Sequence, residues 1–493
     1  MSKKRISVIG AGLGGLAVSC LLASKGHEVT IFEKNDNPGG KINQLKINGY
    51  KFDTGPSLLT MPFILERLFD EVNKNLEDYI NICPVEPICK YFYKDGQIFY
   101  CYQNHEKNLE QIREFAPQDE EAYNNFLKYS ASLYQKTKDA FLENPLYNWS
   151  DLVSMRLTDV LRIDAFKTVA ERVDNTFTSP YLQQFFKRFS TYNGSSPYQA
   201  PATLNVIPHV ELSLGGYYIN GGMYNLIKGL KKLAGELDVE IRYNREIKKI
   251  EVQNGKACAL VDINKNQFDS DIIISNSDAS ETYLQLLSDS VVSNNKAQLI
   301  EKLEPSCSGF VLLLGVEKEF EQLDHHNIFF SSDYKKEFQQ IFKDKVMPDD
   351  PTIYVANTSK SNSSHAPDGG SNLFILVNAP YLSDEWDWQI NRESYAQKII
   401  QILEERGLEK LSDHIQVEEY ITPVDFYKKY RSNKGSIYGT SSNNKLSAFL
   451  RPKNKSREID NLYLVGGSTH PGGGIPLVTL SAFHAAELIE RYE

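Results

Sequence analysis

Near its start the chain has a mostly apolar segment, then a glycine-rich segment, then a second apolar segment. Ile6, Val8 and Ile9 predict a buried parallel strand, and residues 14–25 predict a helix that ends at Gly26. Residues 28–32 predict a second buried strand directly after that helix. Because the glycines stand between the first strand and the helix, this order predicts the turn with which α/β proteins bind dinucleotides.

Each glycine of this turn has its own task in dinucleotide binding. Gly10 permits the tight turn, Gly12 lets the backbone approach a pyrophosphate, and Gly15 lets the helix pack against the strand. The positive end of the helix then faces the phosphates. The second strand ends at Glu33, where a carboxylate accepts hydrogen bonds from a ribose diol. Since this acid disfavours a 2′-phosphate, NADP is not expected.

A second glycine-rich segment follows a predicted strand in the C-terminal part of the sequence. The strand covers residues 461–465, and residues 472–476 lead into an amphipathic helix with apolar positions at Val478, Ala482 and Leu488. The N-terminal amides of that helix would face a flavin ring and stabilise the charge of its reduced form. The two glycine-rich segments together predict one flavin bound from both ends.

Further strand signals predict that the domain holding this flavin is assembled from separated pieces. Strands are predicted at residues 239–243, 247–252, 257–261 and 272–275. The FAD-binding domain is predicted to comprise residues 1–90, 240–310 and 440–493. A substrate and membrane-contact domain is predicted to comprise residues 91–239 and 311–439, with a mostly helical stretch at about 100–190.

The helical stretch is rich in large apolar residues. Each of them is most simply part of a helix core. As a group, some of them are expected to line an apolar tunnel or a patch that dips into a bilayer. They are Phe126, Leu133, Tyr134, Phe141, Leu146, Trp149, Leu152, Met155, Phe166, Phe177, Phe185, Phe186 and Phe189.

Composition and charge narrow the class of protein. The net charge of −10 argues against nucleic-acid binding, and 493 residues with 41% hydrophobic content suffice for about two or three domains. The six cysteines lack CxxC spacing and are expected to be reduced thiols of a cytosolic protein. No apolar run reaches the roughly 20 residues of a spanning helix. We therefore expect a cytoplasmic location, with peripheral contact to the cytoplasmic face of the membrane.

Two further glycine-containing segments follow Glu33, and a nucleotide-binding turn alone does not account for them. Residues 37–41 read Asn-Pro-Gly-Gly-Lys, and residues 49–56 read Gly-Tyr-Lys-Phe-Asp-Thr-Gly-Pro. Here the chain resembles the flavoprotein superfamily of amine oxidases, protoporphyrinogen oxidases and carotenoid desaturases, in which a Pro-Gly-Gly-Arg segment lies along FAD. Lys41 stands at the arginine position, which keeps the charge but loses the planar fork of a bidentate contact.

The C-terminal segment narrows this resemblance. Residues 461–476 read Asn-Leu-Tyr-Leu-Val-Gly-Gly-Ser-Thr-His-Pro-Gly-Gly-Gly-Ile-Pro, which resembles the C-terminal signature of bacterial-type phytoene desaturases and their relatives. Amine oxidases lack the Thr-His-Pro-Gly portion. Residues 275–278, 422–426 and 451–452 match the same family, so the resemblance covers the whole chain.

The resemblance implies an α/β fold with FAD as cofactor. The expected architecture is a Rossmann-like FAD-binding domain of the GR2, amine-oxidase-like type, with an inserted mixed α+β substrate domain whose helical part faces a membrane. The residues expected to hold the cofactor are Gly10, Gly12, Leu13, Gly14, Gly15, Glu33, Lys34, Gly40, Lys41, Gly55, Pro56, Ile247, Asn276, Gly466, Gly473, Gly474, Ile475 and Pro476.

Residues in the central part of the sequence indicate which type of carotenoid desaturase the chain resembles. Residues 188–204, 206–211 and 221–224 resemble the hydroxycarotenoid and methoxyneurosporene 3,4-desaturases more than the phytoene desaturases. Phytoene desaturases carry an acidic residue and an arginine where residues 179–184 read Ser-Pro-Tyr-Leu-Gln-Gln, so no catalytic charged pair is expected here. The resemblance implies 3,4-desaturation of a 1′-hydroxycarotenoid, a long apolar substrate stored in lipid. Phytoene desaturase, carotenoid isomerase, an amine oxidase-type flavoenzyme and a flavin-free lipid carrier like the GDP dissociation inhibitors stay open as alternatives.

Desaturation beside a polyene asks little of side chains, because the cation left by hydride transfer to flavin is delocalised over the conjugated system. Candidate proton acceptors or orienting groups are His209, Glu211, Asp425 and His470. His209 and Glu211 would share one face of a strand, but no third ligand follows at sensible spacing, so no metal is expected. His325 and His326 precede an apolar strand, which predicts a surface turn. The terminal electron acceptor is expected to be oxygen or a membrane quinone.

Overall fold

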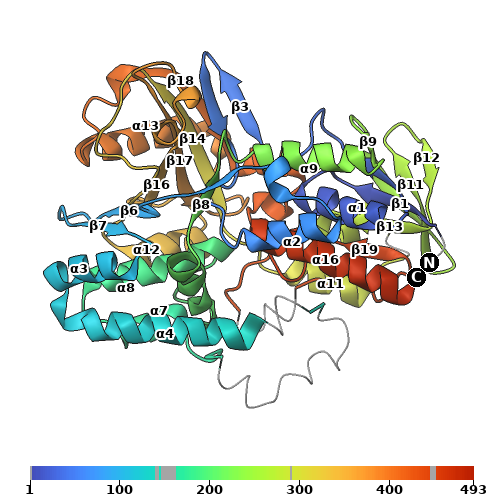
Figure 1. Cartoon of the computed structure of the whole chain (residues 1–493), viewed down its shortest axis with the longest axis horizontal. Coiled ribbons are helices and arrows are strands. Elements are labelled where there is room, and N and C mark those ends of the chain that lie inside the picture. Colours follow the sequence, from blue (N-terminus) through green and yellow to red (C-terminus); the bar gives the residue numbers. More distant parts are fainter. Residues whose placement is uncertain (1–2, 139–143, 146–162, 289–290, 445–450) are drawn as a thin grey trace.

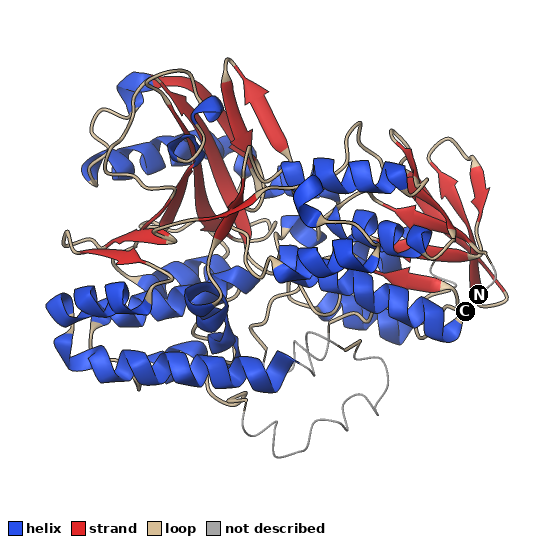
Figure 2. Ribbon diagram, viewed as in Figure 1, coloured by secondary structure: helices blue, strands red, loops and turns tan. Residues whose placement is uncertain are grey.

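A computed structural model describes residues 3–138, 144–145, 163–288, 291–444 and 451–493 and shows two β-sheet regions with helices packed around them (Figures 1 and 2). One region, at the right of Figure 1 where both chain ends lie, is built on a five-stranded parallel sheet in the order β19-β13-β1-β2-β9. Its strands are β1 (Arg5–Ile9), β2 (Glu28–Phe32), β9 (Glu240–Arg242), β13 (Ile272–Ser275) and β19 (Leu462–Leu464).

This sheet is formed by continuous apolar runs because both of its faces are covered. On β13, Ile272 and Ile274 pack against helices, whereas Ile273 packs against a three-stranded antiparallel sheet. The helices are α1 (Leu13–Ser24), α2 (Phe63–Glu71), α9 (Asn225–Glu236) and α16 (Ile475–Tyr492). The three-stranded sheet contains β10 (Ile247–Gln253), β11 (Lys256–Asp262) and β12 (Gln267–Asp269).

The structure confirms the elements predicted around the glycine-rich segments. The predicted helix 14–25 corresponds to α1, whose residues Leu13 to Leu22 are all buried, since α2, α9 and α16 pack around it. The predicted strands 239–243, 247–252, 257–261, 272–275 and 461–465 correspond to β9, β10, β11, β13 and β19.

The second region, at the left of Figure 1, is built on a seven-stranded sheet in the order β18-β14-β17-β16-β15-β6-β7. Neighbouring strands are antiparallel, except that β15 and β6 are parallel. The strands are β6 (Cys89–Phe92), β7 (Ile98–Cys101), β14 (Ser308–Val316), β15 (His326–Phe329), β16 (Ile353–Asn357), β17 (Ser371–Ala379) and β18 (Ile415–Ile421).

Strand β14, which lies between β18 and β17 in this sheet, is buried at every position. On one face Leu312 packs in a cluster with helix α13 (Trp388–Glu405). On the other face Val311 packs with β4 (Tyr50–Asp53) and α14 (Pro423–Tyr430). Both faces of the sheet are therefore covered. Because β4 follows β2 in the sequence, its contact with this sheet links the seven-stranded region to the five-stranded region.

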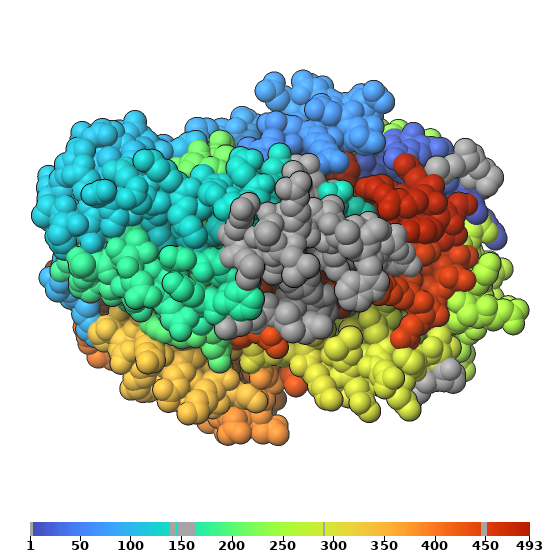
Figure 3. Space-filling model, turned by 90° about the horizontal axis from the view of Figure 1, so that it is seen from below, coloured from blue at the N-terminus to red at the C-terminus, as the bar shows by residue number. Residues whose placement is uncertain are grey.

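A layer of helices lies below β6 and β7 in Figure 1, formed by α3 (His105–Phe115), α4 (Glu120–Thr137), α7 (Val169–Asp174) and α8 (Pro180–Lys187). In Figure 3 this helical layer, in cyan and green, and α16, in red, occupy opposite ends of one face. Its core holds Phe126, Phe177, Phe185, Phe186 and Phe189, while Phe166 is 62% exposed. Of the large apolar residues predicted to form core or tunnel, Phe141, Leu146, Trp149, Leu152 and Met155 lie outside the described residues.

Shorter elements connect these regions. They are the ribbon β3 (Gln44–Ile47) with β4, the pair β5 (Ile82–Pro84) and β8 (Tyr217–Ile219), and the helices α10 (Ala279–Glu281), α11 (Asn294–Lys302) and α12 (Tyr334–Gln339). Across the ranges described above, none of the helices combines the length and the apolar composition needed to cross a bilayer.

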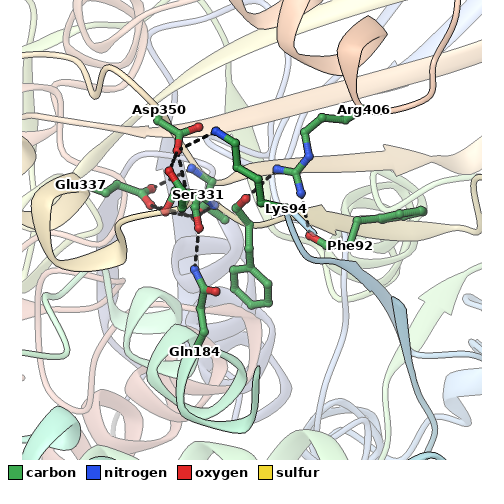
Figure 4. A network of polar contacts seen from close by, with 10 residues as sticks. Phe92, Lys94, Gln184, Ser331, Glu337, Asp350 and Arg406 are labelled. Atoms are coloured by element: carbon green, nitrogen blue, oxygen red, sulfur yellow. Dashed lines mark hydrogen bonds and ion pairs between the residues drawn. The ribbon is translucent and has the colours of Figure 1, made fainter. Parts of the chain in front are cut away.

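A polar network centred on Glu337 of α12 joins the helical layer to the seven-stranded sheet (Figure 4). The Glu337 carboxylate accepts hydrogen bonds from Ser331 Oγ at 2.7 Å, Thr352 Oγ1 at 2.8 Å and the Thr352 amide at 3.1 Å. Gln184 of α8 donates to the Ser331 carbonyl at 2.9 Å. Near it, Arg406 donates to the carbonyls of Phe330 and Phe92, at the ends of β15 and β6.

Glu337 is almost fully buried, and this burial raises the pKa of its carboxyl to about 7. In the folded protein the carboxyl keeps its proton up to about pH 7, whereas the unfolded chain releases it near the ordinary value of 4.5. The stability that this group contributes is therefore complete below the unfolded pKa and is lost as the pH rises through the folded pKa.

We expect Glu337→Gln to remove this pH dependence, because the amide resembles the protonated acid and does not titrate. Between pH 4.5 and 7.5 the free energy of unfolding of the natural protein should fall by up to about 3 kcal/mol relative to that of the variant. Urea unfolding at a series of pH values measures this difference, with Glu319→Gln, at an exposed position, as the control. Parallel curves for the natural protein and Glu337→Gln would contradict the assignment.

Candidate functional site

The N-terminal glycine-rich turn lies at the carboxyl end of β1, where α1 begins. Gly10 adopts φ +91° and its amide donates to the Phe32 carbonyl at 2.8 Å, which joins the turn to the end of β2. A Cβ at Gly15 would lie 2.1 Å from the Gly10 carbonyl oxygen, and one at Gly12 would lie 2.7 Å from Nδ2 of Asn276. The turn can therefore exist only without side chains at these positions.

Glu33 follows β2 and is fixed against this turn. Its Oε2 accepts the Ala11 amide at 2.7 Å, and its Oε1 accepts the Asn35 amide at 2.9 Å. The side chain is almost completely buried, yet it lines the large cavity described below. The carboxylate thus closes one side of the glycine turn, and its contact with a ribose stays a prediction.

The C-terminal segment meets the N-terminal turn at the start of α16. Gly474, with φ +98°, precedes this helix, and the Gly466 amide donates to Ser481 Oγ within it at 2.9 Å. A Cβ at Gly14 would lie 3.2 Å from the Gly466 backbone nitrogen. The N-terminal ends of α1 and α16 therefore open onto the same space, with their free amides available to anionic groups.

That space is a cavity of about 480 Å³ that continues from the glycine turns to the seven-stranded sheet. Of the positions predicted to hold the cofactor, Gly15 alone is not on its lining, since it packs under the turn. Those that line it are Gly10, Gly12, Leu13, Gly14, Glu33, Lys34, Gly40, Lys41, Gly55, Pro56, Ile247, Asn276, Gly466, Gly473, Gly474, Ile475 and Pro476.

Lys41 donates to backbone carbonyls within this lining. Its Nζ contacts the carbonyl oxygens of Ser436 at 3.1 Å and Ile437 at 2.6 Å. Burial lowers the pKa of Lys41 to about 8, which the charge of Asp278 partly opposes. In this structure the single ammonium joins the segment after β2 to residues 436–437, a task that does not need the fork of an arginine.

Of the four candidate proton acceptors, the structure places only Glu211 on the cavity. His470 is buried beside the ring of His484, with its Nε2 3.2 Å from the Asn144 carbonyl oxygen, and burial holds the pKa of His470 well below its usual range. Asp425 caps α14, where its Oδ2 accepts the Thr422 amide at 2.9 Å. These two side chains are engaged in structural contacts and are not part of the cavity lining.

The predicted strand at His209 and Glu211 is wrong, because residues His209–Ser213 form a π-helical turn. Pro208, with φ −51°, precedes the turn, and the fixed φ of proline suits a helix start. The His209 ring therefore packs on Tyr134, with 5.1 Å between centroids, and lines a smaller cavity in the helical layer. Only Glu211, on the other side of the turn, reaches the main cavity.

Glu211 is fully buried and forms an ion pair with Arg188, which the sequence did not reveal as a site residue. One carboxylate oxygen accepts from Arg188 Nη2 and the other from the Tyr192 hydroxyl. The guanidinium also lies over the Phe189 ring, 4.2 Å from its centroid. A charged pair thus lines the cavity, although the expected position at residues 179–184 carries none. Its only local signal was an arginine among aromatic residues at 188–192.

The predicted surface turn at His325 and His326 is also wrong, since both histidines are buried. His326 begins β15, a strand inside the seven-stranded sheet, and lines the cavity. Its Nδ1 is 2.6 Å from the Tyr354 hydroxyl, which is 2.6 Å from Ser57 Oγ. Burial holds the pKa of His326 well below its ordinary value, so the ring is neutral.

The tunnel predicted from the helical stretch has a different lining. Among the residues that the structure describes, none of the large apolar side chains proposed for it lies on the main cavity. Its apolar lining comes mainly from the seven-stranded sheet and nearby loops. These residues are Ile328, Tyr334, Tyr354, Phe374, Leu376 and Val311.

The donor set fits FAD. The backbone amides at two helix starts suit a pyrophosphate and an electron-rich ring, and the Glu33 carboxylate beside the first turn suits a ribose. The absence of side chains at Gly12 and Gly14 leaves room for the Asn276 amide, and the backbone of the turn itself lines the cavity. Two helix N-termini on one cavity define the class of dinucleotide-binding flavoproteins.

Comparisons with known proteins give the family. The description "Flavin containing amine oxidoreductase" matches residues 13–490, and the chain belongs to this family. It is 38% identical to a 4,4′-diapolycopene oxygenase of Methylomonas sp. over 97% of this chain and 96% of the relative. It is 38% identical to a 1-hydroxycarotenoid 3,4-desaturase of Flavobacterium sp. (strain P99-3) over 99% of each. An oxidoreductase structure from Methanosarcina mazei has a TM-score of 0.67 at 18% identity, with 99% of this chain and 100% of that chain covered.

The family establishes the chain as an FAD-dependent oxidoreductase with the amine-oxidase-like flavoprotein fold. FAD, when bound, supplies a two-electron acceptor. The chain supplies the backbone amides of the two glycine segments, the Glu33 carboxylate and the apolar side chains of the cavity lining.

We expect Gly12→Val to abolish FAD binding, because its side chain would collide with the Asn276 amide and fill the approach to the turn. Overpacking of this kind also costs about 1–3 kcal/mol of stability. The flavin absorbance of the purified protein gives the FAD content. Gly235→Val, in α9 where nothing lies within 4 Å, is the matched control. A full complement of FAD in Gly12→Val would refute the placement of the cofactor.

Glu33→Ala should weaken FAD binding by about ten-fold or more. The change removes the carboxylate predicted to accept hydrogen bonds from the ribose, and it leaves the Ala11 and Asn35 amides without their acceptor. Titration of the apoprotein with FAD measures the dissociation constant. Glu28→Ala, at the exposed first position of β2, serves as the comparison. If Glu33→Ala and Glu28→Ala bound FAD equally well, Glu33 would have no role in holding the cofactor.

Proposed function

We propose that this protein oxidises a carotenoid, and in its finer form that it catalyses 3,4-desaturation of a 1′-hydroxycarotenoid in carotenoid biosynthesis. The observation that carries the proposal is the single cavity that joins the two glycine segments to the apolar lining of the seven-stranded sheet. A flavin site continuous with an apolar cavity suits a long hydrocarbon substrate. The identity to the Flavobacterium 1-hydroxycarotenoid 3,4-desaturase, 38% over 99% of both chains, supports the finer form.

The proposed reaction removes two hydrogens from adjacent carbons beside the polyene. One leaves as a hydride, which bound FAD would accept with its electron pair, and the other leaves as a proton, so that a carbon–carbon double bond forms. The apolar lining holds the polyene in place and keeps water from the cation, whose charge spreads along the conjugated chain. Oxygen or a membrane quinone takes up the two electrons in the last step.

A second candidate is oxygenation of a carotenoid. The Methylomonas 4,4′-diapolycopene oxygenase is as similar in identity as the desaturase, at 38%, and several staphylococcal 4,4′-diaponeurosporene oxygenases match at 34–36%. The two candidates share the cavity and differ in what the product gains or loses. Desaturation lowers the product mass by two hydrogens, whereas oxygenation adds oxygen.

The proposal includes peripheral contact with the cytoplasmic face of the membrane. A long polyene is stored in lipid and has to pass from there into the buried cavity. The negative net charge of −10 gives no general attraction to anionic lipid, so such contact would depend on apolar side chains.

A substrate competition tests the proposed function. Purified protein with FAD and liposomes receives equal amounts of phytoene, a 1′-hydroxycarotenoid and 4,4′-diapolycopene, and the products are followed by chromatography with absorption and mass spectra. We expect the hydroxylated compound to lose two hydrogens and give a product that absorbs at longer wavelength. Oxygen gain by diapolycopene would favour the second candidate. Stepwise conversion of phytoene would instead indicate a phytoene desaturase, and isomerisation without a mass change would indicate an isomerase.

A further inference from the structure

A buried arginine, Arg451, lies against the C-terminal glycine segment, residues 466–474. Its Nη1 donates to the Gly467 carbonyl at 3.1 Å, and a Cβ at Gly472 would lie 3.4 Å from the same nitrogen. Arg451 is not on the cavity lining, but Gly467 is. The guanidinium therefore contacts the wall of the cavity through the Gly467 peptide, without a surface of its own on the cavity.

Hydrogen bonds fix Arg451 in this place. Its Nη2 donates to the Thr440 carbonyl at 3.1 Å and lies 3.5 Å from Oδ1 of Asn193. Three residues further on, Asn454 Nδ2 donates to the carbonyl of His470, within the glycine segment, at 2.9 Å. The position of the charge relative to the glycine segment is thus set by several contacts.

The positive charge of Arg451 has no ion-pair partner. All three of its acceptors are neutral, and in the parts of the chain that the structure describes no carboxylate lies within 4.0 Å of it. Arg188, which is also buried, is in contrast paired with Glu211. Burial lowers the pKa of Arg451 to about 10, which the charge of Asp278 partly opposes, so the side chain is still charged at neutral pH.

A second cation, Lys41, stands on the lining of the same cavity. Its ammonium also donates to backbone carbonyls and not to a carboxylate. The charge of Asp278, another residue of the lining, acts on both Lys41 and Arg451. Two cations thus share one acid, which leaves an excess of positive charge beside the cavity.

This excess is larger than the contribution of the helix that begins there. The N-terminus of a helix carries about half an elementary charge, and in α16 Pro476 lacks the amide hydrogen that another residue would offer. Arg451 carries a full charge. Because a buried charge without a partner costs stability, a negative charge that is added nearby is stabilised in return.

FAD acquires such a charge when it is reduced, since its oxidised ring is neutral and its reduced ring can be an anion. The N-terminal turn and Glu33 fit the pyrophosphate and a ribose, so the C-terminal glycine segment is the part of the lining that faces the ring. Charged groups near a flavin ring tune its electron affinity.

We propose that Arg451 raises the reduction potential of bound FAD, because its unpaired charge favours the anionic reduced ring over the neutral oxidised ring. Arg451 acts across the Gly467 peptide and is therefore a positioning residue, not a catalytic one. A higher potential makes the removal of a hydride from a carbon more favourable. The inference concerns the cofactor alone and does not depend on which substrate the protein oxidises.

The test measures the reduction potential of the FAD-loaded protein against a reference dye, without substrate. In Arg451→Gln we expect the equilibrium between reduced and oxidised FAD to shift about ten-fold toward the oxidised form, which for two electrons lowers the potential by about 30 mV. Arg451→Lys keeps the charge but loses the fork, so it should retain the potential of the natural protein. Titration with oxidised FAD shows separately whether either variant disturbs binding.

Asn193→Asp provides a second test in which Arg451 stays in place. The substitution puts a carboxylate at the position that now lies 3.5 Å from Nη2, so it compensates the charge and should lower the potential as Arg451→Gln does. Arg67→Gln is the matched control. The Arg67 guanidinium lies over the Phe483 ring of α16, 4.4 Å from its centroid, but Arg67 is exposed and solvent screens its charge. The potential should not change in this variant.

Equal potentials in the natural protein, Arg451→Gln and Asn193→Asp would overturn the proposal. A decrease in Arg451→Lys as large as that in Arg451→Gln would also overturn it, because the lost fork would then explain the effect. A decrease confined to Arg451→Gln and Asn193→Asp supports it, even if no carotenoid is converted in the substrate competition. Should Arg451→Gln fail to bind FAD, the comparison of Asn193→Asp with the natural protein decides.

Discussion

The arrangement of the whole site depends on the close contact between the Asn276 side chain and three glycines. Asn276 follows β13, which lies between β1 and β19 in the parallel sheet, so its amide stands between the two glycine-rich segments. A Cβ at Gly12, Gly14 or Gly466 would lie 2.7 to 2.9 Å from its amide nitrogen or oxygen. The absence of these side chains lets the starts of α1 and α16 meet at the carboxyl edge of the sheet, where α/β proteins bind ligands.

The glycine segments could be predicted from the sequence because their chemistry is local. A tight turn between strand and helix requires glycine at fixed spacing, so Gly10, Gly12 and Gly466 are informative without any knowledge of distant residues. The strands beside them are equally informative, since both faces of a parallel sheet are buried and the apolar runs are continuous.

The polar part of the cavity could not be predicted in this way. Arg188 and Glu211 are 23 residues apart, on two short helical turns, and meet only because the chain folds back between them. The burial of His326 depends on the pairing of β15 with β16 and β6, which come from distant segments of the sequence. The local sequence gives no sign of this pairing, so it predicted a surface turn. His470 and Asp425, in contrast, were predicted to be site residues but do not line the cavity. Structural contacts occupy both side chains.

The position of the two cofactor-facing helices in the sequence has a consequence for biosynthesis. β1 and α1 leave the ribosome early, but α16, which packs against α1, and β19, which pairs with β13 in the same sheet, come from the other end of the sequence. Until those segments have been synthesised, α1, which is apolar on nearly all sides, lacks one of its main packing partners. A nascent chain would therefore expose this surface throughout most of its synthesis, and FAD can be enclosed from both ends only after translation of the C-terminal helix.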